Sequence, residues 1–438
     1  MRAWESGSPM RHSRTVLVSP EGRRSPAAVD SWRGFMWSGF AAVAFFLLSN
    51  PREILTFPQS LNILLCLTVF VVLADARRVW FPTAPWLVWA FLALCALSAL
   101  WSGRPGETLR ATLLYAIIAL IAGLTAANVE TPVLVRGVVW GAFLVGAATL
   151  LAALVGYSRA GGPIGVAPLH GIHGNRNVVS YSLVLGLAAL LASVPTGSGR
   201  PSRREYWRYV RWFAALAVLC STIFLVRSGT GIAASAALLV AAALLALERR
   251  YLLLTTVAAR VVGIVMLVVG VAIASRFGQE ILALLGKGAD LSGRVPQWRA
   301  IVDVWGEMPC GGYGWGAVWS YSWFDVEPSA PKLQIDQQTG YWLSHGHNIL
   351  FDLLPQLGIA GVLGMCLILG STAAWVFIRV GDLFVQGALW AGLGSMALIL
   401  NGITEPMLSV PVGWLVLVMI SCTGQRLRRD GALDGIVR

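Results

Sequence analysis

Two histidines and an asparagine stand directly before a long apolar run in the stretch "LSHGHNIL" (Leu343–Leu350). The histidine side chain titrates near neutral pH and is also a common metal ligand. His345 and His347 could therefore transfer a proton, bind a metal ion or cap a helix. A second pair, His170 and His173, precedes another apolar run.

Zinc is one alternative for these histidines, because the two pairs together offer four nitrogen ligands. Structural zinc sites favour cysteine, however, and the connections that hold the histidines contain only Cys310. We therefore predict that the protein uses no metal ion and no other cofactor. On this interpretation His347 takes part in acid–base chemistry or caps the following helix, and His345 has a structural role.

Four arginines, Arg176, Arg227, Arg294 and Arg299, also fall in connections between apolar runs. The guanidinium group is a rigid fork of donors that matches phosphate oxygens bidentately. Their placement favours an anionic ligand such as a pyrophosphate. For each arginine taken alone, the alternative is a side chain that extends along the membrane surface to lipid headgroups.

Two carboxylates complete the set of candidate residues. Asp352 lies one helical turn after Asn348, inside an apolar run, where an ionisable group is costly and therefore a candidate functional residue. Asp352 either pairs with an arginine or orients His347. Glu405 lies in the last connection of the chain and either meets an arginine or stays solvated.

The elements that position these residues follow from composition. The chain has 438 residues, 57% hydrophobic and 12% charged, with a mean hydropathy of +0.70. Soluble domains carry about twice that fraction of charge, so the sequence predicts an all-α polytopic membrane protein. About twelve apolar runs approach the roughly 17–25 residues that a membrane span requires. The predicted spans are 34–50, 60–75, 83–101, 110–127, 135–156, 178–195, 210–226, 230–247, 251–274, 348–378, 383–401 and 407–424.

The net charge of +12 is explained by membrane topology rather than by nucleic-acid binding. If the twelve spans alternate, most basic residues lie on one side, as the positive-inside rule requires of the cytoplasmic face. This placement predicts cytoplasmic termini, contact with membrane lipids and no nucleic-acid partner. We expect a disordered cytoplasmic segment at 1–33, a transmembrane domain at 34–424 and a basic cytoplasmic tail at 425–438.

The largest predicted outer loop, 275–347, separates the ninth and tenth spans. It contains an apolar stripe at Trp298, Ile301, Val302 and Trp305, the spacing of an amphipathic helix. This helix is a candidate lid over a lateral entrance for lipid. The alternative is an interfacial helix without a chemical role.

Several motifs occur in the order found in one family. They are "GNRN" before a span, "RSG" between two spans, "GR" and "GYGWG" in the large loop, and "HNILFDLL" at the tenth span. Over roughly residues 160–370 the chain resembles the O-antigen ligase and polymerase superfamily. The resemblance implies metal-independent glycosyl transfer at the outer face of the bacterial inner membrane. A glycan carried on undecaprenyl pyrophosphate would pass to the hydroxyl of a glycan or lipid-glycan acceptor.

The resemblance also implies roles for individual residues. Arg227 and Arg294 match arginines that bind pyrophosphate, and His347 matches a histidine that assists the acceptor. Further candidate substrate-binding residues are Arg176, Asn177, Asn348, Arg299, Asp352 and Glu405. Ligases often have Pro-Asn where this chain has Arg176–Asn177, which favours the exopolysaccharide-polymerising branch.

Three functions therefore stay open at the level of sequence. The first is ligation of a surface polysaccharide, and the second is polymerisation of lipid-linked repeat units. The third is transport of a lipid-linked or anionic solute. Transporters place ionisable groups near the middle of the membrane, whereas the polar residues here are predicted to gather at one face, which favours a transferase.

Overall fold

The computed structural model describes residues 32–76, 79–80, 84–157, 167–195, 202–251, 294–319, 327–378 and 386–436. All regular secondary structure within these ranges is helical. The α-helices are α1 (Trp32–Leu48), α2 (Phe57–Ala74), α3 (Trp86–Leu97), α4 (Pro105–Asn128), α5 (Thr131–Leu154), α6 (Arg176–Ala192), α7 (Arg203–Val226), α8 (Gly229–Tyr251), α10 (Arg294–Glu307), α11 (Ala330–Thr339), α12 (Ile349–Ile378), α13 (Gln386–Gly402) and α14 (Pro411–Ile436). Short 3₁₀ turns, η2 (Ser98–Leu100) and η4 (Gly171–His173), complete the described elements.

Hydropathy located the apolar helices well. A helix lies at each predicted span that the structure describes, while the ninth span, 251–274, falls outside the described residues apart from its first. Among the described residues, six helices are long and apolar enough to cross a membrane, and four shorter helices are also apolar. The protein is therefore a helical multi-pass membrane protein.

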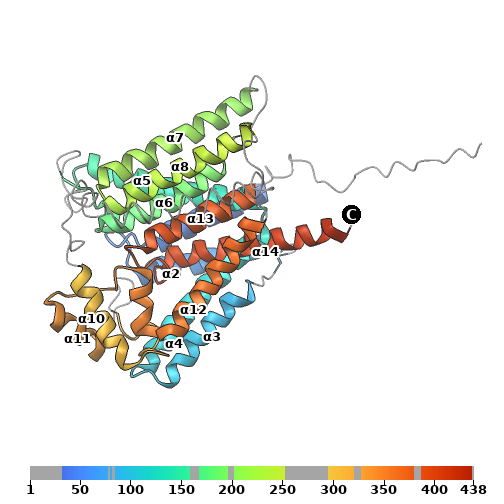
Figure 1. Ribbon diagram of the computed structural model, residues 1–438. Coiled ribbons are helices and arrows are strands. Elements are labelled where there is room, and N and C mark those ends of the chain that lie inside the picture. Colours follow the sequence, from blue (N-terminus) through green and yellow to red (C-terminus); the bar gives the residue numbers. More distant parts are fainter. Residues whose placement is uncertain are drawn as a thin grey trace, which may run out of the picture.

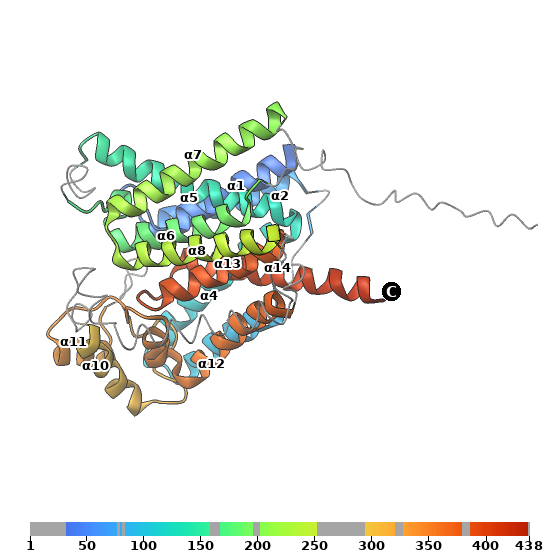
Figure 2. The ribbon, with the colours of Figure 1, turned by 45° about the horizontal axis from the view of Figure 1, so that its top comes forward.

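The apolar helices pack side by side, with α13 and α14 between two groups (Figures 1 and 2). Helices α5, α6, α7 and α8 lie on one side of this pair, and α3, α4 and α12 lie on the other. Helix α1 packs closely on α5 because glycines face it. A Cβ atom added at Gly141 would lie 2.7 Å from the Cβ atom of Phe45. Small residues of this kind allow close helix approach in membranes.

One end of this bundle carries the polar connections. We call it the loop end, and it comprises α10, α11 and residues 49–56, 167–175, 344–348 and 403–410. Figure 1 shows α10 and α11 together at this end. In α10 the buried face contains Gln297, Ala300, Ile301 and Val304. The predicted stripe was therefore partly wrong: Ile301 is buried, but Val302 is 39% exposed.

Helix α12 is broken at Gly358, which has φ 59° and ψ −156°. The residues Pro309–Gly316 fill the break. Tyr313 and Gly314 donate their N–H groups to the carbonyls of Pro355 and Gln356, each at 2.9 Å, and Ile359 donates to Pro309 at 2.9 Å. These bonds satisfy backbone groups that the break would otherwise leave buried and unpaired. Residues 349–357 thus form a separate short helix at the loop end.

Candidate functional site

Glu405 is the centre of a buried polar cluster at the loop end. It lies in the connection between α13 and α14 and is 5% exposed. Its Oε1 atom accepts from Asn177 Nδ2 at 2.9 Å and from an Arg294 amino group at 3.4 Å. Its Oε2 atom lies 3.9 Å from Nε2 of His345. Two connections far apart in sequence, together with α6 and α10, therefore meet at one carboxylate.

His347 joins this cluster through His345. The backbone N–H of His347 donates to Nδ1 of His345 at 3.2 Å, and the two ring centroids are 4.1 Å apart. His347 has φ +49°, the left-handed conformation that non-glycine residues seldom adopt. We call Asn177, Arg294, His345, His347 and Glu405 the Glu405 cluster. Sequence reasoning gave His345 a structural role, whereas the structure places its ring beside both His347 and Glu405.

The unusual backbone at His347 is held by Gly346. Its N–H donates to Oδ1 of Asp352 at 3.0 Å, and its carbonyl accepts from Nε1 of Trp298 at 3.1 Å. A Cβ atom added at Gly346 would lie 2.6 Å from the backbone nitrogen of Asp352. Only glycine therefore fits here. Asp352 of α12 and Trp298 of α10 both fix residues 343–348, which we call the histidine loop.

Asp352 is fully buried and connects three elements. Besides Gly346, its carboxylate accepts from Ser409 Oγ at 2.5 Å and from Gln356 Nε2 at 3.2 Å. These contacts favour the hypothesis that Asp352 orients the loop 343–348, which contains His347. Within one helix, residues five apart share no face, but residues 343–348 fold back over the first turn of α12.

Asn348 ties the same loop to the connection after α13. Its Oδ1 atom accepts from the N–H of Leu350 at 2.7 Å and so caps α12. Its Nδ2 donates to the carbonyl of Ile403 at 2.9 Å. The contacts of Gly346 and Asn348, the two sequence neighbours of His347, therefore fix the position of His347 relative to Glu405.

Burial and positive charge keep both cluster histidines neutral. Burial and the neighbouring Arg294 lower the pKa of His347 to about 4. Burial, His347 and Arg294 hold the pKa of His345 well below its ordinary value. Because His345 Nδ1 accepts a hydrogen bond, its single proton must lie on Nε2, which faces Glu405. At neutral pH, the unprotonated nitrogen of His347 is free to accept a proton.

The remaining predicted arginines differ from Arg294, whose side chain is only 15% exposed. Arg227 ends α7 in a left-handed conformation, φ +53°, and is exposed. Arg176 and Arg299 are also exposed. The next residue after Arg227, Ser228, donates to Oδ1 of Asn177 at 3.5 Å, which connects that turn to the Glu405 cluster. The structure thus joins one predicted arginine directly to the cluster and leaves three at the surface.

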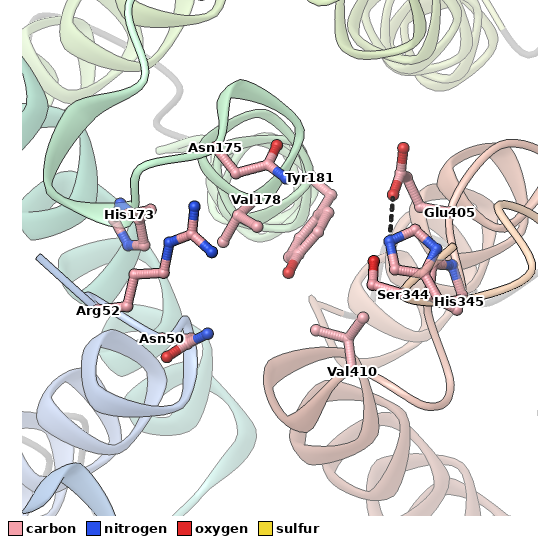
Figure 3. Close-up of a pocket in the computed structure, with 11 residues that line it drawn as sticks. Asn50, Arg52, His173, Asn175, Val178, Tyr181, Ser344, His345, Glu405 and Val410 are labelled. Atoms are coloured by element: carbon pink, nitrogen blue, oxygen red, sulfur yellow. Dashed lines mark ion pairs between the residues drawn. The ribbon is translucent and has the colours of Figure 1, made fainter. Parts of the chain in front are cut away.

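A pocket with an open volume of about 610 Å³ lies beside the cluster (Figure 3). His345 and Glu405 line one wall, and Arg52, His173 and Asn175 line the opposite wall. Sequence reasoning considered His173 only as a metal ligand and did not include Arg52. The two lie far apart in sequence, and no local motif connects them.

The cluster also has the geometry of a candidate metal site. His345, His347 and Glu405 each offer one ligand atom, and these three atoms lie within 4.8 Å of one another. Two histidines and a glutamate are a known ligand set of catalytic zinc. This arrangement competes with our prediction that the site works without metal, and chelation distinguishes the two.

The fold and site define a helical multi-pass membrane protein with a buried histidine, arginine and glutamate cluster at one end. Residues 213–366 match the O-antigen ligase family, a segment that contains Arg227, Arg294 and His347. The chain is also 25% identical over 306 residues to the exopolysaccharide production protein ExoQ of Rhizobium meliloti (strain 1021), covering 68% of this chain and 67% of that protein. Both similarities support the O-antigen ligase and polymerase superfamily for this chain, with a leaning towards exopolysaccharide production.

Proposed function

We propose that the protein is a glycosyltransferase that moves a glycan from undecaprenyl pyrophosphate to an acceptor hydroxyl at the outer face of the bacterial inner membrane. The observation that carries the proposal is the Glu405 cluster, in which Arg294 and two neutral histidines meet at one end of an apolar bundle. A lipid donor places its pyrophosphate at the membrane boundary, and the cluster lies at one end of the apolar bundle.

Arg294 is the cation best placed to bind the donor pyrophosphate. It is mostly buried and held by Glu405, so that it is preorganised before the donor binds. Preorganised cations aimed at a leaving group that gains charge are usually the largest catalytic contribution. Arg227 and Arg176 are exposed and supply further positive charge for the second phosphate.

His347 is the base in this proposal. The acceptor oxygen attacks the anomeric carbon of the donor sugar while the bond from that carbon to the pyrophosphate oxygen breaks. The hydroxyl proton passes to His347, and the bonding electrons leave with undecaprenyl pyrophosphate. A general base of this kind contributes about 10²–10⁴-fold to rate.

Polymerisation is the second candidate. The branch expected from Arg176–Asn177 and the similarity to an exopolysaccharide production protein support an exopolysaccharide as the product. Here the acceptor is itself a lipid-linked repeat unit, and the same residues perform the same bond exchange. Ligation and polymerisation differ in the acceptor, and therefore in the product. Ligation yields full-length chains on a terminal anchor, whereas polymerisation lengthens the chain on the lipid.

A chromosomal deletion, complemented with variants, tests the proposal. His347→Ala and Arg294→Ala should each abolish the surface polysaccharide and cause lipid-linked glycan to accumulate, while Arg110→Ala, an exposed arginine outside the cluster, should complement. Accumulation of short units indicates a polymerase, and accumulation of full-length lipid-bound chains indicates a ligase. Normal polysaccharide with both cluster variants, at normal protein levels, would refute the proposal.

A further inference from the structure

The pocket beside the Glu405 cluster has a wall that the proposed mechanism does not use. This wall comes from the connection between α1 and α2 and from the connection before α6. Figure 3 shows Arg52, His173 and Asn175 on it, facing His345 and Glu405 across the pocket. Val178 and Val410 add apolar surface to the lining.

The two connections of this wall are fastened to each other. Arg52 donates to the carbonyl of Gly174 at 2.9 Å, and the N–H of Glu53 donates to the carbonyl of Ile172 at 3.0 Å. Gly174 has φ +61°, and a Cβ atom added there would lie 2.3 Å from Oε1 of Glu53. The wall is therefore a built surface in which a glycine permits close contact.

His173 is the most deeply buried polar group of this wall, at 1% exposure. Its Nε2 atom lies 2.9 Å from Ser49 Oγ, whereas its Nδ1 atom has no hydrogen-bond partner among the described residues. Burial and the charge of Arg52 lower the pKa of His173 to about 3. The ring is therefore neutral at physiological pH. A buried polar atom without a partner is costly, and a ligand in the pocket that bonds to it removes this cost.

The two carboxylate oxygens of Glu405 face different residues. Oε1 faces Arg294 and Asn177, whereas Oε2 faces His345, which lines the pocket. If Arg294 binds the donor pyrophosphate, a group in the pocket meets Glu405 beside His345, which lines the pocket.

We infer that this pocket binds a sugar ring of the acceptor glycan, with Arg52, His173 and Asn175 as specificity-determining residues. The inference rests on the proposed function and names the acceptor subsite. A pyranose has apolar C–H faces and several hydroxyls, which match the valines and the polar groups of the lining.

The test measures binding and transfer separately, with the full chain in lipid nanodiscs. The probe is the lipid-free oligosaccharide released from the native donor by mild acid. Binding is followed by saturation-transfer difference NMR, and transfer by the dependence of rate on probe concentration. The variants are His173→Gln, which keeps a polar group, and Arg52→Gln. Arg110→Gln is the matched control, because Arg110 also pairs with a glutamate, at 3.5 Å against 3.8 Å for Arg52 and Glu53.

The wild-type protein and Arg110→Gln should bind the probe, and each pocket variant should bind it about tenfold more weakly, as expected for loss of one hydrogen bond. The variants should raise KM for the probe more than they lower kcat. Inorganic pyrophosphate should not displace the probe. Arg52 is partly exposed, so Arg52→Gln decides the question if His173→Gln does not elute as a monodisperse protein.

No binding by the wild-type protein, equal binding by Arg52→Gln, or displacement by pyrophosphate would overturn the acceptor subsite. If binding depends on Arg52 but the protein transfers no glycan, the pocket is still a sugar-binding site. That result would refute the proposed transferase. The two failures are therefore distinguishable.

Discussion

Replacing Glu405 with glutamine perturbs the cluster with little change of shape. The carboxylate accepts two hydrogen bonds at Oε1 and faces the proton on His345 Nε2 at Oε2. The amide of glutamine has only one oxygen, so at least one of these partners is lost. Arg294, which is largely buried, also loses its negative partner.

The size of the effect follows from these contacts. A hydrogen bond to a charged group contributes about 1.5–3 kcal/mol. The Arg294 bond is long, at 3.4 Å, and its side chain keeps some contact with solvent, so we take the lower part of that range. A loss of about 2 kcal/mol in the organisation of Arg294 corresponds to a rate roughly 30-fold lower.

The assay is the initial rate of glycan transfer from the lipid-linked donor in nanodiscs, with elution profile and thermal midpoint as controls for folding. Glu107→Gln is the matched control, since Glu107 pairs with exposed Arg110 at 3.5 Å. Exposed pairs contribute about 0–1 kcal/mol, so this variant should keep its rate within about threefold. A folded Glu405→Gln protein as active as Glu107→Gln would refute the role of the cluster.

Three further predictions concern the histidine loop. Gly346→Ala should lower the transfer rate at least tenfold, because its Cβ atom would lie 2.6 Å from the Asp352 nitrogen. Gly306→Ala, whose Cβ atom would meet nothing within 4 Å, should leave the rate unchanged. Equal rates for the two variants would contradict the close packing at Gly346. The pKa of His347, about 4, predicts that kcat/KM stays level from pH 7 to about 5 and falls below that as the base becomes protonated; a midpoint near 6.5 would contradict the burial of His347. Dialysis against EDTA and 1,10-phenanthroline should leave the rate unchanged, whereas a loss restored by Zn²⁺ would assign His345, His347 and Glu405 as metal ligands.

Hydropathy was sufficient to locate the apolar helices, because a membrane span is determined mainly by length and apolar content. It did not locate the break in α12, because the run from Ile349 to Ile378 is apolar on both sides of Gly358. Pro355 was a signal for this break, but the loop Pro309–Gly316 that stabilises it is distant in sequence. Helix α11 was missed because Ala330–Thr339 is polar and has no apolar period.

The sequence predicted the residue types of the candidate site better than the contacts between them. Ordered motifs selected Arg294 and His347, and Glu405 was selected because it lies in the last connection of the chain. The structure places these three residues in one cluster. The contacts of His345 with His347 and Glu405 were not predicted, because they depend on how the loop 343–348 folds. The pocket wall of Arg52 and His173 was missed for a similar reason, since two separate connections form it.

The most direct test of the account measures release of undecaprenyl pyrophosphate from a purified lipid-linked donor by the reconstituted protein. The account predicts release that depends on added acceptor and is lost in both His347→Ala and Arg294→Ala, although both variants insert and fold. Acceptor-dependent release that continues at the wild-type rate in both variants would contradict it.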